Sequence, residues 1–498
     1  MSDGRLFGLL AAAVAGVCSA VLSSAAVSAD ERPNVLMIVV DDMNDWVGCL
    51  QGHPDVQTPH IDRLAARGVL FANAHAAAPV CNPSRVAALT GRRPSSTGIY
   101  GNDAVWHTVL GDVPSIPAVF RGAGYHTLGG GKVHHHTPGF NRRTDWDGYF
   151  DQVFDSHYQQ QLSRGELQGK FSWPSGFPLN GLPEVRSLQK PPQNPVEFDW
   201  GPFDVVDEEL GDGQMVEWAV KFLQSPREPF FLAAGIYRPH LPFYAPRKYF
   251  EMYDRDRLSL PVCPADDLRD LPAAGLRMAR DRGGDYELVQ QAGRQRELVQ
   301  AYLASISYAD ALVGRLLQAL DATDAGRRTL IVFWSDHGWH LGEKQHLHKF
   351  TLWERSTRVP LIVAGAGVPG QGLRCPAPVS LVDLLPTLCE LSGPGLAAVP
   401  NGIDGQSFAA QVREPAMPRE RPAVTTHGVG NHAVRSARWR YICYADGGAE
   451  LYDHAVDPHE WANLADRPEF ATVISEHARW LPQTDAAPLR VKKQKGQE

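Results

Sequence analysis

The sequence predicts an α/β fold in which helices flank a large mixed sheet, followed by a smaller C-terminal α+β region. Its 498 residues exceed the length of one average domain. Short apolar runs rich in β-branched residues alternate with helical patterns, which is typical of a mostly parallel sheet buried on both faces. A proline- and charge-rich stretch at residues 413–421 then indicates a linker. We therefore predict a main domain at residues 30–412 and a smaller subdomain at 413–498.

The main domain is expected to begin with a strand at residues 34–40, where an unbroken apolar run ends in Asp41-Asp42. The longest helix is expected at about residues 296–320, because apolar side chains recur there at spacings of three and four. Further strands are expected at residues 69–72, 125–129, 230–236, 329–334 and 359–364, and further helices at about 58–68, 116–122 and 380–391.

Two other parts of the chain have a weaker pattern. Residues 155–205 are rich in proline, glycine and aromatic residues without a steady period, so we expect an irregular insertion. The C-terminal subdomain has strand-like runs at residues 433–435, 439–444 and 450–452, and it ends in a basic tail at 490–495.

The first 29 residues are expected to be a signal peptide. Arg5 precedes an apolar run rich in leucine, alanine and valine, and Val27-Ser28-Ala29 offers small residues before a cleavage point at Asp30. The run lacks the sustained leucine and isoleucine content of a stable membrane span. We therefore expect an exported protein, periplasmic or extracellular, with no membrane span after cleavage.

Charge and cysteine content narrow the possible partners. The formal net charge of −8 gives the protein no general attraction for polyanions, so nucleic acid is not an expected partner. An anionic ligand would have to be held by a local cluster of bases. Of the seven cysteines, Cys18 would be lost with the signal peptide, and spacing does not decide how the other six pair.

Cys81 stands at the predicted mouth of a short helix. Asn82 is a good N-cap, Pro83 suits the first helical position, and Gly91 is a natural terminator. The start of a helix favours negative charge, and Arg85 lies about one turn further on. Cys81 is therefore a candidate for an activated nucleophile or its precursor. A buried structural cysteine before an ordinary helix is the alternative.

Acidic residues follow two of the predicted strands. Asp41-Asp42 ends the first strand, and Asp336-His337 follows the strand at residues 329–334. Ligands of open α/β sheets gather at the carboxyl ends of strands, so these groups are expected at one edge. Three clustered carboxylates would repel one another without a cation, and oxygen ligands favour calcium or magnesium. The alternative is that each acid caps a helix or turn.

Basic residues also follow strands. They are Lys132, the run His134-His135-His136, His240 and Lys349. Three consecutive histidines cannot all face one ion in a regular element, so an independent zinc site is a weak alternative. His240 lies between Arg238-Pro239 and Leu241-Pro242, an extended stretch that could hold its imidazole in a fixed direction.

These motifs together resemble the type I sulfatases. The string Cys81-Asn82-Pro83-Ser84-Arg85, followed by Leu89-Thr90-Gly91-Arg92, resembles their signature, in which the cysteine is oxidised after translation to formylglycine. The resemblance covers about residues 33–464, and its finer pattern is similar to the iduronate-2-sulfatase branch. The motifs that carry it are Asp41-Asp42, Gly131-Lys132-Val133, Pro239-His240-Leu241-Pro242-Phe243, Asp336-His337-Gly338-Trp339 with Leu341-Gly342-Glu343, and the stretch at 450–464.

The resemblance implies an alkaline-phosphatase-like fold with the catalytic domain at residues 30–412. It implies one Ca²⁺ ion held by Asp41, Asp42, Asp336, His337 and the formylglycine made from Cys81. The implied catalytic residues are Cys81, Arg85, Lys132, His135, His240 and Lys349. It also implies attack on sulfur by a geminal diol, a covalent sulfo-enzyme and a formylglycine-generating maturation enzyme as partner.

The same resemblance implies a sulfated carbohydrate as the substrate, with a 2-O-sulfated uronic acid as the candidate. Residues 343–348 depart from the pattern of the branch, and so does the histidine run. Lys344, His346, His348 and His134 are therefore the candidates for substrate contacts.

Two other functions stay open. A phosphate or phosphonate monoester hydrolase of the alkaline phosphatase superfamily would more often carry a threonine or serine nucleophile and further ligands for two zinc ions. A non-catalytic glycan-binding protein would be expected to have lost some of these residues. None of them is missing from this sequence.

Overall fold

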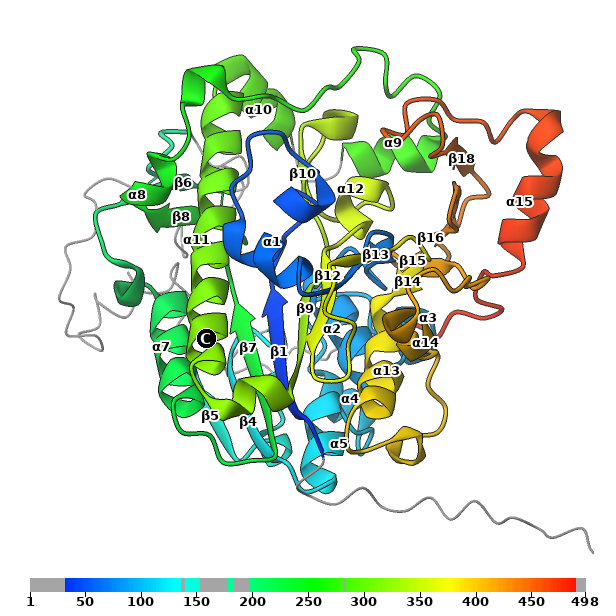
Figure 1. Cartoon of the computed structure of the whole chain (residues 1–498). Coiled ribbons are helices and arrows are strands. Elements are labelled where there is room, and N and C mark those ends of the chain that lie inside the picture. The colour runs from blue at the N-terminus through cyan, green and yellow to red at the C-terminus, as the bar shows by residue number, and fades with distance from the viewer. Residues whose placement is uncertain (1–31, 136–138, 153–177, 183–197, 281–283, 490–498) are drawn as a thin grey trace, which may run out of the picture.

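The computed structural model describes residues 32–135, 139–152, 178–182, 198–280 and 284–489. An eight-stranded mixed sheet forms its centre, in the order β13-β2-β12-β9-β1-β7-β4-β5 (Figure 1). In that order the strands are Leu373–Cys375, Gly68–Phe71, Leu361–Gly365, Thr329–Ser335, Asn34–Val40, Phe230–Ile236, His126–Gly131 and Gly148–Phe150. The large mixed sheet predicted from the sequence is confirmed.

The strands at the centre run parallel and end together. β1 is parallel to both β7 and β9, with Val40 opposite Ile236 and Ser335. β12 is antiparallel to β9 and β2, which makes the sheet mixed. All seven residues of β1 are buried. This register places the residues that follow β1, β7 and β9 at one edge of the sheet.

Helices cover both faces of this sheet, because alternate residues of each strand point to opposite sides. Leu36, Ile38 and Val40 pack with α7 (Gly211–Leu223) and α11 (Gln295–Asp321), and Val35, Met37 and Val39 pack with helices on the other side (Figure 1). The second face is covered by α2 (Cys81–Thr90), α5 (Ile116–Gly122) and α13 (Leu384–Leu391), and α1 (Pro59–Ala65) belongs to the first.

The C-terminal part forms an antiparallel sheet of four strands, β15-β16-β17-β18, which we call the C-terminal sheet. Its strands are Ala423–Thr426, His432–Arg435, Trp439–Cys443 and Ala449–Asp453, and α15 (Ala471–Ala478) follows. β15 was not anticipated from the sequence. The C-terminal sheet packs on the main domain close to α2, since the amide of Thr426 donates to the carbonyl of Ala77 at 2.9 Å.

Shorter elements complete the fold. Strand pairs are β3 (Ala74–His75) with β14 (Val379–Ser380), β6 (Trp200–Phe203) with β8 (Phe243–Pro246), and β10 (His340–Leu341) with β11 (Leu347–His348). Short helices are α3 (Pro94–Thr97), α4 (Trp106–Leu110), α8 (Arg247–Phe250), α9 (Ala273–Ala279), α10 (Asp285–Ala292), α12 (Glu354–Thr357) and α14 (Ala409–Arg413).

Some predictions from the sequence concern residues that lie wholly or partly outside the described ranges. The signal peptide and the basic tail lie outside the described residues, as does most of the insertion at 155–205, whose last residues form the regular strand β6. All six cysteines of the described chain are free thiols. Within the described residues, no helix has the length and apolar character needed to cross a membrane.

Candidate active site

The ends of β1 and β9 bring the predicted acidic residues together. The amide of Asp41 donates to the carbonyl of Ile236 at 3.1 Å, and that of Asp336 donates to Val40 at 3.2 Å. The amide of Asp42 donates to the Asp336 carboxylate at 3.1 Å. These hydrogen bonds fix Asp41, Asp42 and Asp336 at the carboxyl edge of the sheet, where all three are fully buried.

Helix α2 presents Cys81 to this edge. The helix begins at Cys81 itself, with Val80 as N-cap, so Asn82 is not the cap that the sequence suggested. The side-chain amide of Asn82 instead donates to the carbonyls of Gly101 and Ala104, at 3.0 and 2.8 Å. Gly91 ends the helix as expected, with φ of 71°.

The Cys81 thiol is buried among bases. Lys349 Nζ lies 2.9 Å from its Sγ, His337 Nε2 3.3 Å and Lys132 Nζ 3.8 Å. Burial raises the pKa of Cys81, but Lys132, Lys349 and His337 outweigh that effect and lower it well below 9.0. The site therefore stabilises negative charge at the position of Sγ.

Arg85 ties the two strand ends to each other. Its guanidinium pairs with Asp336 at 2.8 Å and with Asp41 at 3.0 Å, and it donates to the carbonyl of Val133 at 3.1 Å. Burial raises the pKa of Asp336 to about 7 against the lowering effect of Arg85. Burial also raises the pKa of Asp41, but Lys132 and Arg85 hold it well below its usual value.

One carboxylate oxygen in this cluster has no hydrogen-bond partner among the described residues, namely Oδ2 of Asp42. Ligand atoms of Asp41, Asp42, Cys81 and His337 all lie within 4.8 Å of one another, which suits a metal ion. Asp336 is not in that group. Its oxygens accept from Arg85 and from the amides of Asp42 and His337. We call Asp41, Asp42, Cys81, Asp336 and His337 the catalytic cluster.

The other predicted bases surround the catalytic cluster. Lys132 pairs with Asp41, and Lys349 Nζ lies 2.7 Å from Asp42. His240 Nε2 lies 3.8 Å from Asp42, and its side chain is 24% exposed whereas the lysines and carboxylates are at most 5% exposed. His240 therefore stands on the solvent side of the buried groups.

The structure distinguishes two of the three consecutive histidines. His135 interacts with Cys81, and burial lowers its pKa to about 4. His134 instead stacks on Trp106, with ring centroids 5.3 Å apart, and burial lowers its pKa to about 3. His136 lies outside the described residues. The sulfatase register, which places the histidine three positions after Lys132, thus coincides with the ring beside Cys81.

The segment that departs from the branch pattern is held by other parts of the protein. Lys344 Nζ pairs with Asp267 at 2.7 Å and also donates to the carbonyl of Glu460. The His346 ring bonds to the carbonyls of Ala279 and Lys349, each at 2.8 Å. Both side chains are therefore engaged within the protein, and the substrate role expected for Lys344 and His346 stays a prediction.

The two remaining candidates differ, because His348 has a polar partner while both ring nitrogens of His134 are buried without a hydrogen bond to any described residue. His348 Nε2 lies 2.6 Å from Asp285 and its ring packs against Trp339. His134 contacts Trp106 rather than the catalytic cluster. The substrate contact expected for His134 and His348 stays a prediction.

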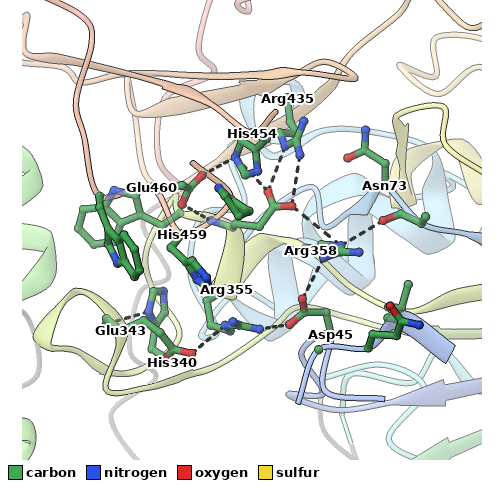
Figure 2. Close-up of a pocket in the computed structure, with 18 of the residues that line it drawn as sticks. Asp45, Asn73, His340, Glu343, Arg355, Arg358, Arg435, His454, His459 and Glu460 are labelled. Carbon is green, nitrogen blue, oxygen red and sulfur yellow. Dashed lines mark hydrogen bonds and ion pairs between the residues drawn. The ribbon is translucent and has the colours of Figure 1, made fainter. Parts of the chain in front are cut away.

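A pocket of about 520 Å³ separates the main domain from the C-terminal sheet (Figure 2). Figure 2 shows Arg435, His454 and Glu460 on one side of it and Asp45 and Arg355 on the other. Ligand atoms of Glu354, His454 and Glu460 also lie within 4.8 Å of one another. We call Glu354, Arg435, Arg440, His454 and Glu460 the interdomain cluster. None of the catalytic cluster lines this pocket.

Comparisons with known proteins agree with the motifs. A family model described as sulfatase matches residues 33–394, and one described as N-sulphoglucosamine sulphohydrolase, C-terminal, matches 342–486. A sulfatase of Formosa agariphila is 37% identical, with 92% of this chain and 87% of that protein covered. Human iduronate 2-sulfatase is 33% identical, with 78% and 74% covered.

Solved structures show the same fold. A 2-O GAG sulfatase superposes with a TM-score of 0.68 at 24% identity, covering 90% of this chain and 91% of that one. A phosphonate monoester hydrolase of Agrobacterium radiobacter superposes with a TM-score of 0.71 at 23% identity, covering 90% and 94%. Both identities are below 25%, so these likenesses establish the architecture alone.

Proposed function

The chain belongs to the sulfatase family, and from this premise we propose that it hydrolyses a sulfate ester of a carbohydrate, using formylglycine made from Cys81 and one calcium ion. The observation that carries the proposal is the position of Cys81. Its Sγ lies within 4 Å of Lys132, Lys349 and His337. A carboxylate oxygen of Asp42 lies within 4.8 Å of this sulfur.

The donor set fits both groups. The oxygen-rich cluster with one unpartnered Asp42 oxygen suits a hard cation, for which Asp41, Asp42, His337 and residue 81 are the nearest ligands and Asp336 lies beside them. Formylglycine would supply a hydroxyl nucleophile as its hydrate, and calcium would act as a Lewis acid.

The side chains of the chain itself divide the remaining work. Lys132 and Lys349 neutralise the charge that builds up on the sulfuryl oxygens. His240, on the solvent side of Asp42, is placed to protonate the departing sugar oxygen. His135 is neutral at physiological pH, so Nδ1 or Nε2 of its ring can accept a proton from the group at position 81. Arg85 holds Asp41 and Asp336 in place.

We propose a 2-O-sulfated uronic acid as the sugar, on the support of the 33% identity to human iduronate 2-sulfatase. The test is a panel of defined sulfated mono- and oligosaccharides, read by free sulfate release. The expected result is faster release from 2-O-sulfated uronates than from neutral 6-O-sulfated sugars. Equal rates would reject the uronate preference. Hydrolysis of a phosphonate monoester added to the panel, with no sulfate released from any sugar, would reject the sulfatase activity itself.

We further propose that the protein is exported and matured by a formylglycine-generating enzyme. The support is the sequence of residues 1–29 and the complete signature from Cys81 to Arg92. Mass spectrometry of the active protein tests both points, because it should show a start at Asp30 and an aldehyde or its hydrate at position 81. An unmodified Cys81 in fully active enzyme would reject the formylglycine proposal.

A further inference from the structure

Asp42 adopts a backbone conformation that its residue type disfavours. Its φ is 61°, in the left-handed region, and it is one of few non-glycine residues in the described chain with a positive φ. Such a conformation persists only where the surrounding structure holds it. The conformation matters because it directs the Asp42 carboxylate, with its unpartnered Oδ2, into the catalytic cluster.

The hydroxyl of Tyr302 makes two of the hydrogen bonds that hold this turn. It donates to the carbonyl of Asp42 at 2.7 Å and accepts from the amide of Asn44 at 3.0 Å. Tyr302 lies within α11, far from Asp42 in sequence, and is completely buried. Its ring packs edge-on against Trp46 and Phe243, at centroid distances of 5.6 and 5.2 Å.

A second hydroxyl completes the arrangement. Ser335 Oγ accepts from the amide of Met43 at 3.0 Å and donates to the carbonyl of His337 at 3.0 Å. The Asn44 side chain donates to the carbonyl of Trp339 at 2.9 Å. Together with Tyr302, these bonds satisfy the carbonyl of Asp42 and the two amides that follow it, and they connect the turn to the loop that carries His337.

We propose that Tyr302 is a positioning residue for the metal site, which keeps Asp42 in its left-handed conformation so that its carboxylate is available to the cation. The inference rests on the proposed function only through the metal ion. Without the hydroxyl, the carbonyl of Asp42 and the amide of Asn44 would both be buried without a partner. The turn can then relax toward an ordinary conformation, which moves the carboxylate away from the cluster.

The chain offers a matched control on the same helix. Tyr308 is also completely buried in α11, and its hydroxyl donates to the backbone carbonyl of another aspartate, Asp207, at 2.9 Å. Asp207 is not part of the catalytic cluster. Tyr302→Phe and Tyr308→Phe therefore remove the same atom and the same type of hydrogen bond from similarly buried sites, and only the first touches the Asp42 turn.

The experiment is calorimetric titration of the full-length, chelator-treated protein and both variants with calcium, with urea unfolding in parallel. We expect at least a tenfold loss of calcium affinity in Tyr302→Phe and less than a twofold change in Tyr308→Phe. We also expect excess calcium to restore sulfate release by Tyr302→Phe, a rescue that a merely structural role would not allow.

Equal calcium affinities in the two variants would overturn the inference, as would a parent protein that binds no calcium. A parent that binds calcium but releases no sulfate from any ester would reject the proposed function instead. In that case the calcium titrations still decide the role of Tyr302, so the two failures are distinguishable.

Discussion

Among the residues that the structure describes, carboxylates and imidazoles gather within 4.8 Å at two places, the catalytic cluster and the interdomain cluster. Their bases differ. At the interdomain cluster, Arg440 contacts both Glu354 and Glu460, Arg435 also pairs with Glu354, and the second Glu460 oxygen accepts the amide of Glu354. Every carboxylate oxygen there has a partner.

At the catalytic cluster, lysines replace most of those guanidinium groups, and Oδ2 of Asp42 is left without a hydrogen bond. A guanidinium is a planar fork that occupies both oxygens of a carboxylate, whereas an ammonium is a point charge. The difference teaches that closeness of ligand atoms does not make a metal site. A carboxylate oxygen with an available lone pair is also required. Whether an arginine or a lysine pairs with the carboxylate affects how many of its oxygens stay available.

The largest effect is expected from Cys81→Ala. Removal of the nucleophile should lower sulfate release by roughly a thousandfold or more. Because the alanine is smaller and the site stays polar, the chain should still fold, which circular dichroism and the urea midpoint would show. Sulfate release by Cys81→Ala near the parental rate would mean that residue 81 is not the nucleophile.

Calcium affinity should depend on the catalytic cluster and not on the interdomain cluster. Asp42→Asn should weaken calcium affinity by at least about 100-fold, since loss of groups that only support a ligand already costs 10–100-fold. Glu460→Gln is the matched change in the interdomain cluster and should leave calcium affinity and stoichiometry unchanged. Titration calorimetry measures both. A reduced stoichiometry in Glu460→Gln would show that the interdomain cluster also holds an ion.

Arg440→Met should destabilise the fold without affecting calcium. Arg440 is fully buried, and its removal leaves Glu354 and Glu460 less compensated, at a cost of roughly 3–5 kcal/mol in the free energy of unfolding. Arg438→Met removes an arginine whose side chain is 56% exposed from its pair with Asp453, so it should cost less stability than Arg440→Met. Similar urea midpoints for the two variants would contradict this account of the interdomain cluster.

The same cluster predicts a loss of stability in acid. Burial alone would raise the pKa of Glu354, but Arg435, His454 and Arg440 outweigh it and hold that pKa well below 4.5. The unfolded chain therefore takes up protons first as the pH falls, so the stabilisation is complete above about pH 4.5 and is lost below it, at about 1.4 kcal/mol per unit of pKa difference. Urea unfolding between pH 7 and pH 3 tests this, and Arg440→Met should show a shallower decline.

The smallest effect is expected on substrate affinity in Lys344→Met. Lys344 pairs with buried Asp267 rather than reaching the catalytic cluster, so KM should change by less than about twofold while the urea midpoint falls. Steady-state kinetics with the best substrate of the panel would measure KM. A tenfold rise in KM at unchanged stability would support the substrate role expected from the sequence.

Local pattern was sufficient for the six inner strands of the sheet and for most of the catalytic cluster, whereas the short edge strands β5 and β13 were not predicted. Parallel strands end at one edge, so the acids that follow β1 and β9 had to meet, and their place could be predicted from two apolar runs. Helix α11 was predicted to within a few residues because its apolar periodicity is long and regular.

Contacts between distant segments could not be predicted in the same way. Nothing in residues 343–348 indicates that Lys344 pairs with Asp267 or that its neighbour in space is Glu460. In the sequence, Tyr302 has the spacing of any core residue of an amphipathic helix. Only the structure shows that its hydroxyl donates to the carbonyl of Asp42. The sequence suggested Asn82 as the N-cap, but the side-chain amide of Asn82 donates to the carbonyls of Gly101 and Ala104, about twenty positions away.

The complete burial of Cys81 also limits when the proposed oxidation of its thiol can occur during biosynthesis. The residue has no exposed surface, and the C-terminal sheet packs on the segment between β3 and α2, with Thr425 and Thr426 bonded to the carbonyls of Ala76 and Ala77. The oxidation proposed for Cys81 would therefore have to precede the docking of the C-terminal sheet. A chain that completes this docking before oxidation would be well folded and catalytically inert.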